Sequence, residues 1–159
     1  MLLEPGPPRA VDVKAIRQEL GLTQAQLADL ASVSLRTVQS CEQGWRHPST
    51  GLERMVLLLL MAHRNGSSEA DVACWEATVC PEELREECLA YRTRRGQLCW
   101  ILTGRLYRGL RLPSWTEKRT MCERCLFFRH LMGGELPLLD RALPGPGCGG
   151  RCGRDVADE

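Results

Sequence analysis

The chain has 159 residues, 43% of them hydrophobic and 26% charged, and its formal net charge is +1. This length allows one domain or two small ones, and the near-neutral balance excludes strong electrostatic steering by the molecule as a whole. The first residues are apolar only up to Leu3, so no secretory signal is predicted and we expect a cytoplasmic protein.

Two short helices are expected at the start of the chain. Asp12 can cap a helix over residues 13–20, whose apolar side chains recur at helical spacing. Thr23, followed three residues later by Gln26, forms the capping-box pattern that opens a second helix.

A third and a fourth helix follow. Ser34 can cap the third, which we expect to end at Gly44. Cys41 falls on its inner face, and we interpret it as a core thiol rather than a sensor, because free Cys behaves as a small buried apolar residue. Ser49 or Thr50 can cap the fourth helix, whose apolar run is too short for a membrane span and predicts a buried helix or a dimer contact.

The second and third helices, joined by a tight turn, form the pattern that places one helix in the DNA major groove. The outer face of the third helix carries long donors and short hydroxyls, which are the groups that read base edges and bind phosphates. Double-stranded DNA is therefore the predicted partner, a homodimer is expected, and a small helical bundle without a DNA role is the alternative. The candidate DNA-binding residues are Gln24, Ser34, Leu35, Arg36, Thr37, Gln39, Ser40 and Arg46.

Residues 11–64 resemble the lambda-repressor-like (Cro or Xre type) helix-turn-helix family in helix order and in the Glu42-x-Gly44 ending of the third helix. The resemblance implies that Gln24 contacts the DNA backbone. It also implies base contacts from Leu35, Arg36 and Ser40 and a phosphate contact from Thr37. Leu35, where relatives often carry a polar residue, either touches a thymine methyl group or packs.

Charge is sparse in this region, because residues 1–66 hold seven Lys/Arg and six Asp/Glu. Either the positive charge is local to the docking face, or binding relies on dimerisation. Nonspecific DNA affinity should therefore be weak and sensitive to salt.

The second half of the chain is rich in cysteine. An odd total of nine cysteines in a cytoplasmic chain favours metal or redox chemistry over structural disulfides. One pair has the C-x-x-C spacing that points two thiolates at one metal. A segment of about 60 residues buries a small core and often needs such a staple. The candidate metal ligands are Cys74, Cys80, Cys88, Cys99, Cys122 and Cys125.

The residue pattern leaves the group and its ligands open. Zinc and a 4Fe–4S cluster each take four thiolates, so two of the six cysteines would be spare. One set is Cys80, Cys88, Cys122 and Cys125, and another includes Cys74 and Cys99. Trp75 and Trp100 can shield the site from water or simply pack in the core. His130 is expected on the surface rather than as a ligand.

Residues 72–131 resemble the bacterial two-CW domain, through Cys74-Trp75-Glu76, Cys99-Trp100 and Cys122-x-x-Cys125. The usual additional Cys after Gly104 is absent here. The resemblance implies attachment to a signalling or regulatory module.

The predicted architecture is mainly α-helical. It comprises a four- to five-helix DNA-binding bundle, a small irregular or α-helical Cys-rich domain and a flexible tail. The expected boundaries are a flexible start at 1–10, the DNA-binding domain at 11–66, a linker at 67–71, the Cys-rich domain at 72–132 and a Gly/Pro-rich tail at 133–159. Cys148 and Cys152 in that tail are interpreted as mobile thiols.

The sequence contains none of the common hydrolase, phosphate-loop or dinucleotide motifs, so we do not expect an enzyme. We predict a sequence-specific DNA-binding transcriptional regulator whose Cys-rich domain binds a metal or iron–sulfur cluster and senses redox or metal state. One alternative is a structural zinc, dimerisation or partner-docking domain. Another is a thiol–disulfide protein that uses Cys122 and Cys125.

Overall fold

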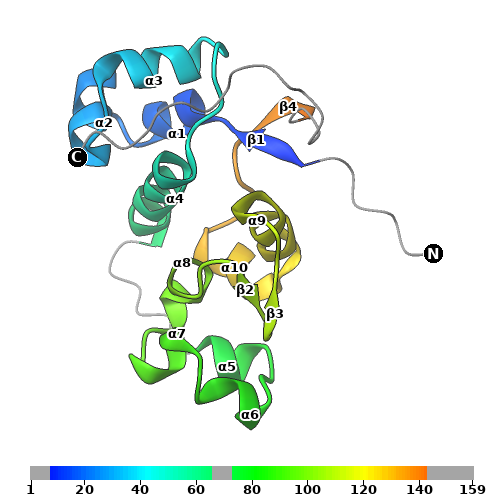
Figure 1. Cartoon of the computed structure of the whole chain (residues 1–159). Helices are drawn as coiled ribbons and strands as arrows, with labels where there is room; N and C mark the ends of the chain where they lie inside the picture. Colours follow the sequence, from blue (N-terminus) through cyan, green and yellow to red (C-terminus); the bar gives the residue numbers. More distant parts are fainter. Residues whose placement is uncertain (1–7, 66–72, 143–159) are drawn as a thin grey trace.

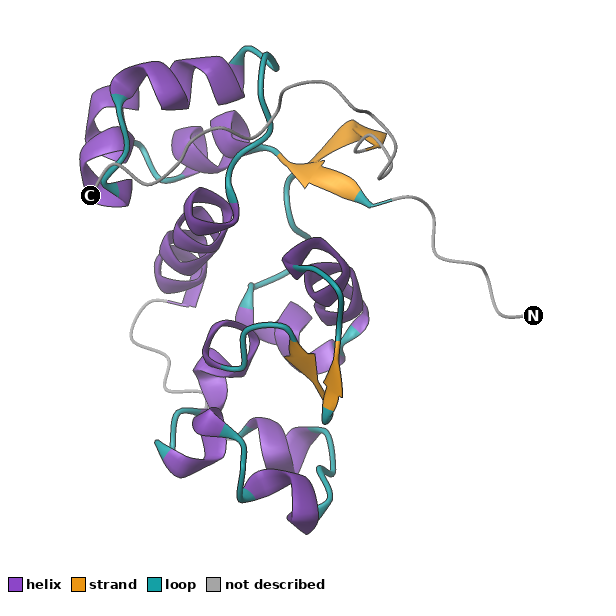
Figure 2. Cartoon of the chain, viewed as in Figure 1, coloured by secondary structure: helices purple, strands orange, loops and turns teal. Residues whose placement is uncertain are grey.

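The structure is a computed structural model that describes residues 8–65 and 73–142, and it is mainly helical, as the sequence predicts (Figures 1 and 2). Four helices form the N-terminal bundle, drawn at the top of Figure 1. They are α1 (Val13–Glu19), α2 (Gln24–Ala31), α3 (Leu35–Glu42) and α4 (Thr50–Asn65).

Side-chain caps fix where these helices begin. Asp12 accepts a hydrogen bond from the Ala15 N–H, and Ser34 accepts one from the Thr37 N–H. Thr23 forms the predicted capping box at the start of α2. Of the two candidate caps of α4, Ser49 is the one observed, because its Oγ accepts a hydrogen bond from the Leu52 N–H at 3.2 Å. Each such cap contributes about 1 kcal/mol.

The Cys-rich half is built from short segments in the lower part of Figure 1. Between residues 73 and 112, turns connect four short helices, a 3₁₀ turn and a two-stranded hairpin. In chain order the segments are α5 (Cys74–Ala77), α6 (Glu82–Arg85), α7 (Leu89–Arg92), a 3₁₀ turn (Gly96–Leu98), α8 (Cys99–Leu102), β2 (Leu106–Tyr107), β3 (Leu110–Arg111), α9 (Trp115–Arg124) and α10 (Leu126–Leu131).

The ends of the described chain are tied together by a small sheet. β1 (Arg9–Val11) pairs antiparallel with β4 (Leu138–Ala142), and Val11 lies opposite Leu138 (Figure 2). The predicted flexible ends, at 1–10 and 133–159, include most of β1 and all of β4. The structure corrects this, because the N-terminal strand supplies backbone partners to the segment that leaves the Cys-rich half. The predicted linker at 67–71 and the tail beyond 142 lie outside the described residues.

One hydrophobic core runs through both halves. Leu27, Val38 and Leu60 of the bundle belong to the same buried cluster as Trp100 and Phe128 of the Cys-rich half. Helix α4 lies between the two halves (Figure 1) and contacts α1 and α2 on one side and residues of the Cys-rich half on the other. Its Arg54 donates to the Ile101 carbonyl at 2.5 Å.

A buried ion pair crosses this junction. Glu53 of α4 and Arg119 of α9 are 5% and 1% exposed, and Arg119 Nε lies 2.6 Å from Glu53 Oε1. The Trp115 indole N–H donates to the same carboxylate at 3.0 Å, and Arg119 also bonds Glu123 and the Arg9 carbonyl. Burial raises the pKa of Glu53, while Arg119 and Trp115 oppose that shift. The two charges therefore depend on each other for solvation.

Among the residues that the structure describes, no helix combines the length and the apolar character needed to cross a bilayer.

Replacing Arg119 with Met should lower the free energy of unfolding by about 3 kcal/mol, because Glu53 would lose its buried counter-charge. Urea unfolding at neutral pH measures the change. Arg124→Met, at an exposed position of the same helix, is the matched control and should cost less than about 0.5 kcal/mol. Equal losses for the two variants would contradict the assigned role of the ion pair.

Candidate functional site

The outer face of α3 presents polar side chains. Leu35 is 43% exposed and Arg36 is exposed, while Gln39 and Ser40 are half-buried. Val38 and Cys41 face the core, so the helix has one buried side and one side available to a partner. Arg46, in the turn after α3, is also exposed.

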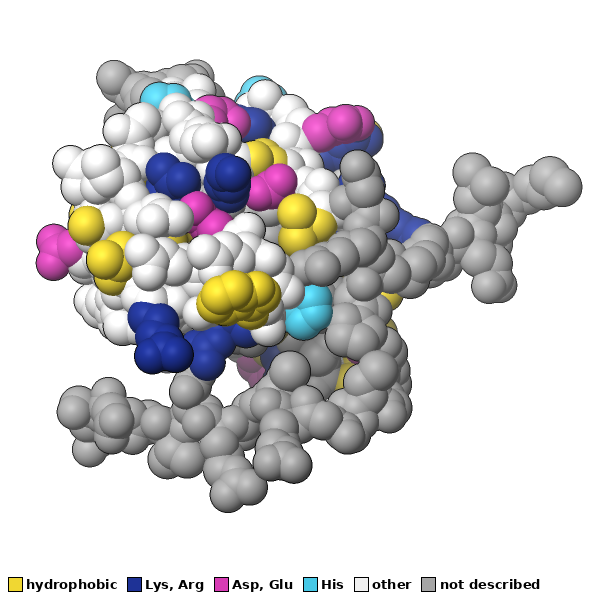
Figure 3. Space-filling model, turned by 90° about the horizontal axis from the view of Figure 1, so that it is seen from above, with side chains coloured by type: hydrophobic (Ala, Val, Ile, Leu, Met, Phe, Trp, Pro, Cys, Tyr) yellow, Lys and Arg dark blue, Asp and Glu magenta, His cyan; other side chains and the backbone are white. Residues whose placement is uncertain are grey.

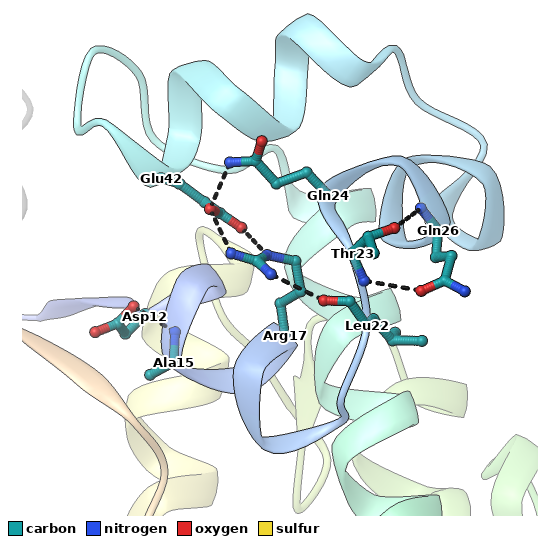
Figure 4. Close-up of polar contacts among 8 residues, drawn as sticks. All are labelled: Asp12, Ala15, Arg17, Leu22, Thr23, Gln24, Gln26 and Glu42. Atoms are coloured by element: carbon teal, nitrogen blue, oxygen red, sulfur yellow. Dashed lines mark hydrogen bonds and ion pairs between the residues drawn. The ribbon is translucent and has the colours of Figure 1, made fainter.

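A carboxylate at the end of α3 fixes this helix against the rest of the bundle (Figure 4). Glu42 accepts two hydrogen bonds from the Arg17 guanidinium of α1, at 2.5 and 3.0 Å, and one from Gln24 of α2 at 2.9 Å. Arg17 also donates to the Leu22 carbonyl at 2.8 Å. Three helices are therefore joined through one side chain, which sets the angle at which α3 is presented.

This role of Glu42 was not predicted from the sequence, in which Glu42 is only part of a helix ending. The family resemblance implies a DNA-backbone contact for Gln24, whereas the structure shows one N–H of its amide on Glu42. An amide nitrogen carries two N–H groups, so Gln24 retains a second donor. Gln24 can thus hold α3 and contact a partner at once.

Ser34 and Thr37 are engaged with each other. Ser34 Oγ accepts from the Thr37 N–H at 3.1 Å and lies 2.9 Å from Thr37 Oγ1. Ser34 therefore acts first as the cap of α3. The Thr37 side chain is half-buried beside it.

Charge on this face is dispersed. Seen from above, the surface over α2 and α3 is largely uncharged, with basic and acidic side chains interspersed (Figure 3). This agrees with the nearly balanced charge of residues 1–66. Affinity for a polyanion would therefore depend on a few placed groups rather than on a broad basic patch.

Comparison with protein families identifies this bundle. The family model described as helix-turn-helix matches residues 13–59. Residues 13–59 form a helix-turn-helix domain. Searches of curated proteins and of solved structures found no match to the chain. The helix-turn-helix domain implies binding to DNA, and the resemblance of residues 72–131 to the two-CW domain stays a prediction.

The Cys-rich half contains a cavity of about 290 Å³. Its wall is mainly apolar and includes Trp100, Phe127 and Phe128, together with the buried Lys118. All six candidate ligand cysteines line this one cavity: Cys74, Cys80, Cys88, Cys99, Cys122 and Cys125. The spacing of these cysteines in the sequence suggested a shared site, and in the structure all six line the same cavity.

The thiols differ in their surroundings. A hydrogen bond between the side chains of Cys74 and Cys99 lowers the pKa of Cys74 and raises that of Cys99. Burial raises the pKa of Cys122 to about 12. Cys125 follows one turn later, and its N–H donates to the Cys122 carbonyl at 2.8 Å. Without a bound cation, the deepest of these thiols are protonated at neutral pH.

Lys118 is the one charged side chain in this wall that is nearly inaccessible, at 2% exposure, among the cavity residues described. Its Nζ donates to Thr103 Oγ1, the Gly104 carbonyl and the Leu106 carbonyl, at 2.7, 3.0 and 2.6 Å. Three acceptors require three N–H donors, so this geometry fits the ammonium form. Burial lowers the pKa of Lys118, while the nearby Cys122, Cys99 and Cys88 raise it.

Other candidates have simpler places. His130 is exposed on α10, as expected. Trp100 lines the cavity, whereas Trp75 packs edge-on against Tyr91 with ring centroids 4.9 Å apart. Cys41 is 8% exposed in the bundle core, and burial raises its pKa, which supports the interpretation as a core thiol. Cys148 and Cys152 lie outside the described residues.

The variant Glu42→Gln tests the contribution of the Glu42 carboxylate, which binds Arg17 and Gln24 at the end of α3. Burial raises the pKa of Glu42, but the bonds from Arg17 and Gln24 outweigh it and leave the pKa below its ordinary value of 4.5. A carboxylate whose pKa is lowered in the folded state stabilises the fold at every pH above its ordinary pKa. This stabilisation is lost as the pH falls through the lowered pKa of the folded state.

We therefore expect the wild type to exceed Glu42→Gln by about 1 kcal/mol in unfolding free energy at pH 7. The difference should shrink as the pH falls below 4.5. Denaturant unfolding across this range measures it, with the exposed Asp29→Asn as the control. A difference that is independent of pH would contradict the role given to the Glu42 charge.

Proposed function

We propose that this chain is a sequence-specific DNA-binding transcriptional regulator in which α3 enters the major groove. The observation that supports this proposal is the exposed polar face of α3, which lies within the helix-turn-helix domain at residues 13–59. Groove reading needs a helix that is fixed in orientation and free on one side. The hydrogen bonds of Glu42 to Arg17 and Gln24 fix the orientation of α3, and the exposed side of α3 is free to enter the groove.

The residues of α3 take different roles in this proposal. Arg36 reads a base edge, because an exposed guanidinium can donate two parallel hydrogen bonds to guanine. Leu35 beside it contacts a thymine methyl group. Gln39 and Ser40 lie further along the same face, and Gln24, Thr37 and Arg46 contact phosphates. Binding as a homodimer to paired half-sites would raise the affinity that the dispersed charge leaves low.

In the same proposal the Cys-rich half holds a thiolate-bound metal or iron–sulfur group and reports redox or metal state to the DNA-binding half. The convergence of six cysteines on one cavity supports this. The continuous core supports a connection between the halves, since Trp100 lines the cavity and packs in one cluster with the bundle. When bound, such a group would supply a redox-dependent or metal-dependent change at this cavity.

Arg36→Ala should reduce discrimination between preferred and unrelated DNA sequences by about 1–3 kcal/mol. Titration of labelled duplexes selected by the wild-type protein measures it. Arg129→Ala, an exposed arginine of α10 in the other half, is the matched control and should leave discrimination unchanged. An equal loss of affinity for every sequence would make Arg36 a phosphate contact, and no loss would remove α3 from the interface.

A further inference from the structure

The six thiols around the cavity come from four parts of the chain. Cys74 and Cys99 each begin a short helix, α5 and α8, and Cys122 and Cys125 lie at the junction of α9 and α10. The half-buried Cys80 directs its Sγ to the Pro81 carbonyl at 3.8 Å, and Cys88 directly precedes α7. We call the first four thiols the inner set and the other two the outer pair.

Glycine allows the first pair of the inner set to meet. A Cβ atom on the buried Gly96 would lie 2.7 Å from the Cys74 backbone nitrogen and 3.0 Å from Ala73 Cα. The turn before α8 can thus lie directly against the start of α5, which brings Cys74 to Cys99. Any larger residue at 96 would separate the two segments.

The second pair comes from the junction of α9 and α10. Cys122 occupies the last turn of α9, and Cys125 is the residue at which α9 ends and α10 begins. Both line the cavity that Cys74 and Cys99 also line. Four thiols from three separate parts of the chain therefore line one cavity.

The size of this space separates two classes of ligand. Zinc draws four thiolates to about 2.3 Å from one point and leaves no cavity. Among the described residues, no group of three or more His, Cys, Asp or Glu side chains is arranged to hold a metal ion. Thiolates that each bind a different iron of a cluster stand further apart, around a volume. A cavity of about 290 Å³ with a mainly apolar wall fits the second arrangement.

The positive charge in the cavity wall also favours a cluster. Lys118 is buried, and the three groups that accept its hydrogen bonds are uncharged oxygens. A buried cation is costly unless an anion lies nearby. A four-iron cluster held by four thiolates carries net negative charge, so Lys118 would be its counter-charge within the protein.

We propose that the cavity binds a 4Fe–4S cluster through Cys74, Cys99, Cys122 and Cys125, with Lys118 as its buried counter-charge. This assignment rests on the metal-binding part of the proposed function and selects both the group and its ligands. Cys80 and Cys88 line the same cavity but stand outside the proposed ligand set. Lys118 acts as a positioning residue through its charge.

The test uses the full-length protein, reconstituted under anaerobic conditions with ferrous iron and sulfide. We expect about four irons and four sulfides per chain, with the broad visible absorption of an iron–sulfur protein. Cys99→Ser and Cys122→Ser should each lose this absorption and most of the iron. The double variant Cys80→Ser/Cys88→Ser is the matched control and should keep both.

Lys118→Met gives a second readout. Loss of the positive charge should shift the reduction potential of the cluster to more negative values and speed iron loss to a chelator by about tenfold. An unchanged potential would remove Lys118 from the proposal. Circular dichroism of the apoproteins shows whether each variant has folded.

Two outcomes would overturn the assignment. One is stoichiometric zinc without bound iron and sulfide after purification and after reconstitution. The other is cluster loss in Cys80→Ser/Cys88→Ser with retention in Cys99→Ser. Because iron, sulfide and absorption are measured without DNA, failure here is distinct from failure of the DNA-binding proposal, which the Arg36→Ala titration tests alone.

Discussion

The buried pair of Glu53 and Arg119 is the constraint on which the arrangement of the two halves depends. Each charge lies where water cannot solvate it. Glu53 is paired by Arg119 only when the other half is docked in register, whereas Arg119 also pairs with Glu123 of its own helix. Trp115 adds a directional hydrogen bond to the Glu53 carboxylate. Apolar surfaces alone would tolerate sliding between α4 and α9, whereas this set of contacts specifies one position.

The same junction connects the two candidate sites. Arg54, the next residue of α4, donates to the Ile101 carbonyl of α8, the helix that begins at Cys99. On the cavity side, Trp100 packs against Phe128 and Trp115, with ring centroids 5.8 and 6.2 Å apart. A change around Cys99 therefore acts on side chains that contact α4 directly. Helix α4 in turn packs against α1 and α2 of the helix-turn-helix domain.

Local signals in the sequence predict much of the N-terminal half. Thr23, Ser34 and Ser49 each begin a helix, and Cys41 occupies the core. Caps and helical periodicity act over three or four residues, so a single sequence displays them. The face of α3 could be predicted for the same reason, although its contacts with DNA stay a prediction.

Features that depend on distant parts of the chain could not be predicted in this way. The β1–β4 sheet joins Arg9 to Ala142, and neither strand has a local pattern that names its partner. Glu53 and Arg119 are charged residue types that usually lie on the surface, so their burial depends on packing that the sequence does not display. The spacing of the cysteines indicated a shared site, but that all six line one cavity could be seen only in the three-dimensional arrangement.

Selection of bound fragments from random duplex DNA tests whether α3 recognises a specific sequence. The full-length protein would be used as isolated anaerobically and after exposure to oxidant. We expect the anaerobic protein to enrich one short sequence and the oxidant to change this enrichment. Failure to enrich any sequence in either state would contradict the claim that α3 makes this chain a sequence-specific regulator.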